Sequence, residues 1–240
     1  MSISVFGSEE FDVIDLTNTI YSGMPVWPGH SQLVVEDLKL LTVDGYAVKK
    51  ISMNTHIGTH IDTEAHMVEN GRTLDRYPIE TYFGRTLVVD VSSTPAGKPI
   101  PLDTVRKHLE QKKGSEILLL HTGHSLRRGN NSRYLFEWPY VDLDLAQYLS
   151  TKGLKAVGTD GLSIAGWGGS VPGHGPITST AREVHQTLLR MGTIIIEELT
   201  NLDKLLQGKE FADVYTIFLP LRIDGSDGSP VRAVALKRRD

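Results

Sequence analysis

The middle of the chain alternates segments of two different periodicities, and this alternation limits the fold more than any other feature of the sequence. Residues 101–111 (PLDTVRKHLEQ) place Val105 and Leu109 four positions apart and end before Gly114, a pattern typical of an amphipathic helix. Residues 116–122 (EILLLHT) form a short apolar run that predicts a buried strand. The order continues with a helix at 142–153, a strand at 155–160, a helix at 179–192, a strand at 193–199 and a helix at 199–208. Alternating helices and strands predict an α/β fold.

Runs with strand character flank this region on both sides. Residues 11–17 (FDVIDLT) and 85–92 (RTLVVDVS) are rich in β-branched side chains and predict strands. Residues 212–223 and 229–238 form two further β runs around the turn sequence DGSDG, which predicts a C-terminal β-hairpin. The sequence contains no internal repeat and no low-complexity linker. We therefore expect a single domain over residues 1–240, with a mixed sheet and flanking helices.

Composition excludes several classes of function. The formal net charge is only −4, and the basic residues are scattered, which argues against nucleic-acid binding. The chain has no cysteine, so disulfides, thiolate ligands and a cysteine nucleophile are excluded, and histidines and carboxylates are the strong metal ligands that remain. Residues 1–16 lack a basic and apolar leader, and no run reaches the roughly 18 apolar residues that span a bilayer. We expect a soluble cytoplasmic protein that does not bind membranes.

Histidines cluster in residues 54–71 (NTHIGTHIDTEAHMVENG). Of the nine histidines among 240 residues, three fall within this segment. The eleven positions 56–66 within it hold five residues of metal-ligating types: His56, His60, Asp62, Glu64 and His66. The cluster predicts a metal centre, and the alternative is a polar loop whose histidines cap helices or are solvated.

These side chains can meet at one ion only if the chain bends between them. On a regular strand, positions 56 and 60 would stand roughly 13 Å apart, too far for ligand bonds of about 2 Å. Gly58 lies between them and can take a positive φ without steric cost. A helical path would also bring His56 next to His60, since residues four apart share a face. Imidazole combined with carboxylate favours Zn²⁺, Mn²⁺ or Fe²⁺ over Ca²⁺ or Mg²⁺.

The segment HIGTHIDTEAH resembles the HxGTHxDxPxH signature of the cyclase-type metal-dependent hydrolases, which include bacterial kynurenine formamidase and isatin hydrolase. Residues 13–29, 119–125, 185–205 and 218–236 are similar to other parts of that family, so the resemblance covers nearly the whole chain. It implies a swivelling β/β/α fold, a small-molecule substrate and a homo-oligomer, either a dimer or a tetramer.

The resemblance also implies roles for individual residues. The metal ligands of the motif would be His56, His60 and Asp62. His66 would be the catalytic acid/base. In the formamidase branch the aspartate bridges two ions, and a His and a Glu twelve positions apart complete the second site; His185 and Glu197 have this spacing. The resemblance therefore implies one or two divalent ions, Zn²⁺ or Mn²⁺, in each chain.

The sequence departs from the family pattern at three positions. Glu64 replaces the usual proline and could be a ligand, a partner of a ligand or a surface residue. His124 replaces a frequent tryptophan, which predicts a more polar substrate wall. Ala165 stands where an aspartate is common, so the role of that aspartate is not carried over to this chain.

Aromatic residues near glycine-rich turns are candidates for substrate binding. Residues 161–176 (GLSIAGWGGSVPGHGP) contain six glycines and two prolines and predict a long functional loop. Trp167 in this loop, together with Trp27 and Tyr21, could hold an aryl substrate. The alternative for both tryptophans is that they only pack within their own turns.

The remaining histidines divide into two groups. His121, His124 and His174 are further candidates near the site. We expect His30, and His108 on a predicted helix face, to be surface residues.

Several functions are compatible with such a site. The favoured one is hydrolysis of a C–N amide bond, as in an arylformamidase that releases formate from N-formylkynurenine, by metal-activated water with a histidine acid/base. Alternatives are ring opening of a cyclic amide such as isatin, a metal-dependent cyclase or lyase, and a non-enzymatic metal-binding module. A serine mechanism is disfavoured because no G-x-S-x-G elbow is present. A structural zinc site is disfavoured because such sites are usually closed by four ligands and often rich in cysteine.

Overall fold

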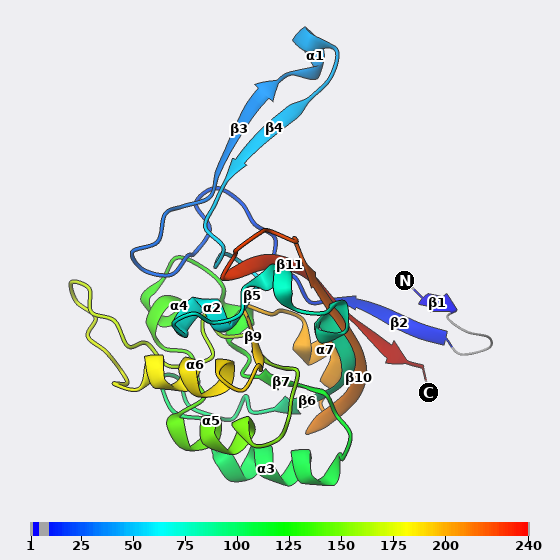
Figure 1. The fold of residues 1–240 in the computed structure, drawn as a ribbon, viewed down its shortest axis with the longest axis vertical. Coiled ribbons are helices and arrows are strands. Elements are labelled where there is room, and N and C mark those ends of the chain that lie inside the picture. Colours follow the sequence, from blue (N-terminus) through cyan, green and yellow to red (C-terminus); the bar gives the residue numbers. More distant parts are fainter. Residues whose placement is uncertain (1, 5–9, 240) are drawn as a thin grey trace.

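A mixed sheet that closes on itself forms the centre of the fold (Figure 1). The computed structural model describes residues 2–4 and 10–239; residues 1, 5–9 and 240 lie outside it, so the expectation about a leader in residues 1–16 falls partly outside the described residues. The strands are β1 (Ser2–Ser4), β2 (Glu10–Asp15), β3 (Val34–Lys39), β4 (Val48–Ser52), β5 (His60–Asp62), β6 (Phe83–Asp90), β7 (Ile117–His121), β8 (Ala156–Thr159), β9 (Ile194–Glu197), β10 (Phe211–Pro220) and β11 (Gly228–Arg238). The large sheet runs β1-β2-β11-β10-β6-β7-β8-β9-β5, and β5 also pairs with β11, which closes the circuit.

The predicted alternation of helices and strands is confirmed. The helices are α1 (Leu41–Asp44), α2 (Glu64–Met67), α3 (Leu102–Gln111), α4 (Ser132–Phe136), α5 (Leu143–Ser150), α6 (Ala181–Leu189) and α7 (Leu202–Leu206), with 3-10 turns at Leu74–Arg76, Ile79–Tyr82 and His124–Arg127. Strands β6, β7, β8 and β9 are parallel, as the intervening helices require. The terminal β10–β11 hairpin is also confirmed.

Alternate side chains of the parallel strands build two separate cores. Leu118 and Leu120 of β7 face one way and pack in a cluster with Val105 of α3, Leu145 of α5 and Val184 of α6. The intervening residues of these strands face the interior of the closed sheet, where they join apolar side chains of α7 and β10. A strand exposes successive side chains on opposite faces, and burial on both faces explains the continuous apolar runs in the sequence.

The β3–β4 ribbon is an arm that extends away from the sheet, with α1 at its tip (Figure 1). The sequence analysis did not predict this ribbon. Ion pairs between Glu36 and Lys50 and between Asp37 and Lys49 join its strands. Many of its apolar side chains are exposed: Val34, Val35, Leu38, Leu40, Leu41, Val43, Tyr46, Val48 and Ile51.

The expectation that His108 is a surface residue is wrong. Its side chain is buried, with its ring 5.3 Å from that of Phe211. The reason is helical geometry, since His108 lies three positions after Val105 and therefore shares the face of α3 that packs on the sheet. His30 is exposed, as expected. Within the described residues, no helix is both long and apolar enough to cross a membrane.

Candidate metal centre

The chain bends at Gly58, where the sequence required it. Gly58 has φ +59°, a left-handed conformation that residues with a Cβ rarely adopt. A Cβ at this position would also lie 2.7 Å from Cγ2 of Ile20, so both the backbone and the packing favour glycine. The bend brings the rings of His56 and His60 to a centroid distance of 5.2 Å. The strand β5 then begins at His60 and directs Asp62 toward the same place.

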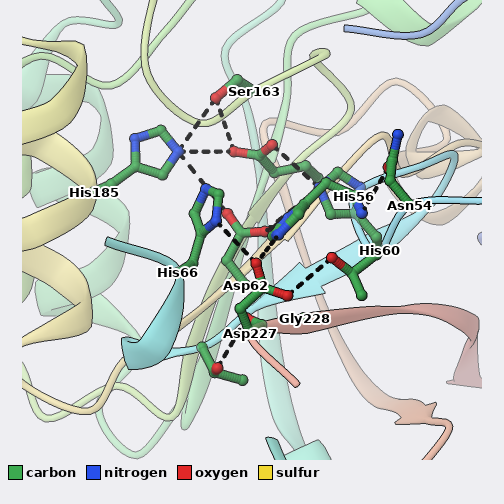
Figure 2. Close-up of polar contacts among 12 residues, drawn as sticks. Asn54, His56, His60, Asp62, His66, Ser163, His185, Asp227 and Gly228 are labelled. Carbon is green, nitrogen blue, oxygen red and sulfur yellow. Dashed lines mark hydrogen bonds and ion pairs between the residues drawn. The ribbon is translucent and has the colours of Figure 1, made fainter. Parts of the chain in front are cut away.

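His56, His60 and Asp62 form the first group of converging ligand atoms (Figure 2). Nδ1 of His56 lies 2.7 Å from Oδ1 of Asp62, and Nε2 of His60 lies 3.4 Å from the same oxygen. The Nδ1 of His60 donates to the carbonyl of Gly58 at 2.7 Å. This bond holds the His60 ring with Nε2 directed into the cluster, as is common for metal-binding histidines.

Asp62, His185 and Glu197 form a second group that shares Asp62 with the first. Nε2 of His185 lies 3.2 Å from Oε1 of Glu197 and 3.9 Å from Oδ2 of Asp62. The Nδ1 of His185 donates to the carbonyl of Ala181, one turn earlier in α6, which directs Nε2 into the site. Glu197 ends β9 directly opposite His60 in the antiparallel β5–β9 ladder. The twelve-residue spacing therefore reflects a helix that returns to the next strand.

Asp227 is a site residue that the sequence analysis missed. Its Oδ2 lies 2.9 Å from Nε2 of His56 and 3.7 Å from Nδ1 of His66, and the three residues form a third group of potential ligands. The signal was present but ambiguous, because Asp227 belongs to the DGSDG turn and aspartate is common in turns. Its place in the site follows from pairing of β11 with β5, where Gly228 is opposite Asp62.

The electrostatics of the cluster favour a buried cation. Burial disfavours the charged form of His56, but the carboxylates of Asp62 and Asp227 outweigh it and raise its pKa to about 10. The pKa of Asp62 is lowered far below its usual range, since the surrounding histidines outweigh its burial. In the described part of the chain, Oδ2 of Asp62 is buried without a hydrogen-bond partner. An orphaned carboxylate oxygen between imidazole nitrogens and a second carboxylate fits a divalent metal.

A two-lobed cavity opens from the cluster. The inner lobe, about 160 Å³, is lined by His56, His60, His185 and Glu197, and also by Trp27, His30, His66, Met67, Leu162, Ser163 and Glu198. The outer lobe, about 450 Å³, shares part of this lining, including Trp27 and His66. Residues 161–176 contribute Leu162, Ser163 and three glycines to the walls, as expected of a functional loop.

The three aromatic candidates for substrate binding have different surroundings. Trp27 lines both lobes, with its ring centroid 5.0 Å from that of Trp167. Trp167 is buried behind it against Phe136 and is absent from the described lining of either lobe. Tyr21 is half-exposed and likewise lies outside that lining. The structure therefore brings one of the three, Trp27, to the cavity.

The departures from the family pattern lie outside the three ligand groups. Glu64 accepts hydrogen bonds from the Arg72 guanidinium at 2.9 Å and the Tyr77 hydroxyl at 3.2 Å, so it ties α2 to the following loop. His124 is buried, with its ring stacked 4.8 Å from that of Tyr134, so it does not form a polar substrate wall. Ala165 is buried, and its carbonyl accepts from the Trp138 indole.

The other histidine candidates also lie apart from the three groups. His174 stacks on Phe136, with ring centroids 4.0 Å apart. His121 ends β7, and its Nδ1 lies 3.5 Å from Oδ2 of Asp160, which follows β8. Asp160 is buried and accepts hydrogen bonds from the Thr122 amide and hydroxyl at 2.7 and 2.6 Å. These bonds connect the carboxyl ends of neighbouring strands, which is a structural role.

Glu198 is a second residue that the sequence analysis did not single out. It lines the inner lobe at φ +53°, an uncommon conformation for a residue with a side chain. Its Oε2 accepts hydrogen bonds from Arg128 at 3.4 Å and from the Tyr134 hydroxyl at 3.3 Å. Burial raises its pKa to about 7, with Arg128 and Tyr134 opposing the shift. The only feature of the sequence that could have indicated a place for Glu198 in the site is its position next to Glu197.

The chain is similar to known proteins over most of its length. The Cyclase family model, described as "Putative cyclase", matches residues 14–165. A kynurenine formamidase of Bacillus thuringiensis subsp. konkukian is 32% identical over 223 residues, which cover 92% of this chain and 95% of that enzyme. A protein from Bacillus stearothermophilus that is described as a "predicted metal-dependent hydrolase" has a similar structure, with a TM-score of 0.72, 30% identity and coverage of 95% of this chain and 99% of that one. An isatin hydrolase bound to the product analogue thioisatinate superposes with a TM-score of 0.82 at 21% identity, covering 95% of this chain and 93% of that one, which shows a shared fold.

Proposed function

The chain belongs to the Cyclase family, and from that premise we propose that it is a metal-dependent arylformamidase that hydrolyses N-formylkynurenine. The observation that carries the proposal is the buried Oδ2 of Asp62, which has no hydrogen-bond partner among the described residues and belongs to a carboxylate that two ligand groups share. The formamidase relatives match nearly the whole chain, and they support the C–N bond of a formamide as the bond that is cleaved. The products would be formate and the free aryl amine.

The proposed ligands come from four separate elements. One ion would be held by His56, His60 and Asp62, and a second by Asp62, His185 and Glu197. A divalent cation of this kind, when bound, polarises a carbonyl and lowers the pKa of a ligated water from 15.7 to about 7. The mixed imidazole and carboxylate donors support Zn²⁺ or Mn²⁺, the metals that we propose.

His66 is the proposed acid/base. It lies in both lobes of the cavity, and its Nδ1 is 3.7 Å from the Asp227 carboxylate. That carboxylate can hold a proton on Nδ1 and orient the ring, so that Nε2 faces the substrate. His66 would accept a proton from the attacking water and return it to the nitrogen of the breaking C–N bond. Without that proton the amine would be a poor leaving group.

Metal analysis of the purified protein, combined with turnover assays on N-formylkynurenine and isatin, tests the proposal. We expect one or two equivalents of Zn²⁺ or Mn²⁺ per chain and faster hydrolysis of N-formylkynurenine. Preferential opening of isatin would replace the proposed substrate with a cyclic amide. Turnover of neither by the metal-replete protein would refute both assignments.

A homo-oligomer is a second part of the proposal. The exposed apolar side chains of the β3–β4 arm support it, because a two-stranded ribbon is marginally stable in water unless its surface is covered. We expect a second copy of the chain to cover the arm. Light scattering should give a dimer or tetramer for the intact protein, and Leu41→Asp with Val43→Asp should shift it toward monomer. A monomer in the intact protein would contradict this part.

A further inference from the structure

The outer lobe of the cavity leads away from the metal centre toward the start of α6. Both lobes are bordered by Trp27, His66, Met67, Ser163 and His185. A substrate whose amide carbonyl reaches the ligand groups would therefore extend past Trp27 into the outer lobe. The outer lobe, at about 450 Å³, is the larger of the two and has room for the rest of a small aromatic molecule.

Part of the wall of the outer lobe is backbone without side chains. Gly166, Gly168 and Gly169 line it. A Cβ at Gly166 would lie 2.9 Å from the ring of Tyr140, and one at Gly169 would lie 2.6 Å from that of Trp167. These close contacts keep the wall as bare backbone. Such a wall, together with the Trp27 indole that also lines the lobe, suits a planar ring.

Arg182 carries the one permanent charge among the described residues that line this lobe. Its side chain is exposed, and no ion pair or hydrogen bond joins it to another described residue. No Asp or Glu belongs to the described lining of the outer lobe. Among the described residues that line the outer lobe, no carboxylate therefore neutralises the guanidinium.

The position of Arg182 relative to the metal centre follows from α6. Arg182 precedes His185 by three residues, so the two side chains are neighbours on one face of the helix, with Cβ atoms about 5–6 Å apart. His185 points to Glu197 and Asp62, whereas Arg182 lines only the outer lobe. Helix α6 thus fixes the position of the Arg182 guanidinium relative to His185 and the metal centre.

We infer that the outer lobe binds a carboxylate carried by the substrate at the end opposite its amide, through the guanidinium of Arg182. Arginine is suited to this role because its planar fork donates two parallel hydrogen bonds to one carboxylate. The inference rests on the proposed function and narrows it to aromatic amides whose side chain ends in a carboxylate. An uncharged substrate such as isatin would make no use of Arg182.

The test compares Arg182→Gln with Arg190→Gln on two substrates. Arg190 lies at the end of the same helix, is exposed, and is absent from the described linings of both lobes, so its substitution removes the same charge. The substrates are N-formylkynurenine and N-formyl-2-aminoacetophenone, which lacks the carboxylate. We expect Arg182→Gln to raise KM for N-formylkynurenine by about 10- to 100-fold, the range for loss of a hydrogen bond to a charged group. The kcat for this substrate, and both kcat and KM for N-formyl-2-aminoacetophenone, should change less than twofold. Arg190→Gln should change neither.

Equal effects of Arg182→Gln on both substrates, or none on either, would overturn the inference. Calorimetric titration with kynurenine and with 2-aminoacetophenone separates this outcome from failure of the proposed function. Arg182→Gln should weaken binding of kynurenine alone, whether or not the formamide is hydrolysed. Unchanged affinity for kynurenine would refute the carboxylate site, and failure to hydrolyse either formamide would refute the proposed function.

Discussion

Oδ2 of Asp227 lies 2.9 Å from Nε2 of His56, although the two residues are 171 positions apart in the chain. The contact forms because β11, which begins one residue after Asp227, pairs with β5 and brings the C-terminal hairpin to the metal centre. Asp227 also accepts a hydrogen bond from the Thr55 hydroxyl at 2.9 Å, which fixes its orientation.

Asp227→Asn should weaken metal binding without unfolding the protein. The amide keeps the shape of the side chain but removes the negative charge beside His56 and His66. Loss of a partner that orients metal-binding histidines typically costs about 10- to 100-fold in metal affinity or activity. Competition with a chelator measures the affinity, and Asp224→Asn, an exposed residue of the same turn, serves as the control. Equal affinity in both variants would show that Asp227 does not support the site.

His66→Ala should retain its metal and lose its activity. We expect kcat to fall by about 10²- to 10⁴-fold, the usual contribution of a positioned acid/base. His60→Ala is the comparison, since His60 belongs to a proposed ligand group and should lose metal as well as activity. If His66→Ala loses its metal too, then the group of His56, His66 and Asp227 is a ligand set, and the proposed acid/base role is wrong.

Gly58→Ala should destabilise the protein and disturb the metal centre together. A side chain at φ +59° costs about 1–2 kcal/mol, and the added Cβ would also press on Ile20. Gly153→Ala is a matched control, because Gly153 has φ +65° but open space around its Cβ position. Denaturant unfolding should show a larger loss for Gly58→Ala, with reduced metal content in that variant alone. Equal losses of unfolding free energy in the two variants would mean that packing around Gly58 does not contribute to stability.

The contribution of His121 to stability should fade at alkaline pH. Burial disfavours the imidazolium, but Asp160 and more distant carboxylates outweigh it, so the pKa of His121 is raised in the folded protein. A raised pKa means that the stabilisation is complete below the unfolded-state pKa of about 6.5 and is lost as pH rises through the folded-state value. The difference in free energy of unfolding between the wild type and His121→Gln should therefore shrink from pH 6 to pH 9. A constant or growing difference would contradict the ion pair with Asp160.

Glu64→Pro should leave the metal content unchanged. Glu64 is the first residue of α2, a position that tolerates proline, so the backbone can accept the proline of the motif that this segment resembles. The variant loses the contacts with Arg72 and Tyr77, and we expect the free energy of unfolding to fall by about 1 kcal/mol. Metal analysis and denaturant unfolding check both parts. Loss of metal would identify Glu64 as a ligand.

The sequence by itself determined the order of helices and strands and the need for a bend between His56 and His60. The helix at 101–111 and the strand at 116–122 could be predicted because periodicity and glycine positions are local properties. The need for a bend at Gly58 followed from the reach of the chain between His56 and His60, and the structure confirms it.

Only the tertiary structure decided which distant residues meet. Asp227 joins His56 through strand pairing across the whole chain, and Arg182 borders the cavity because α6 packs beside the loop at 161–176. His108 was misplaced because burial of a polar residue depends on what covers its helix face. These contacts depend on which strands pair and which faces pack, and the free energy that selects among such arrangements belongs to the whole sheet and its two cores rather than to any local segment.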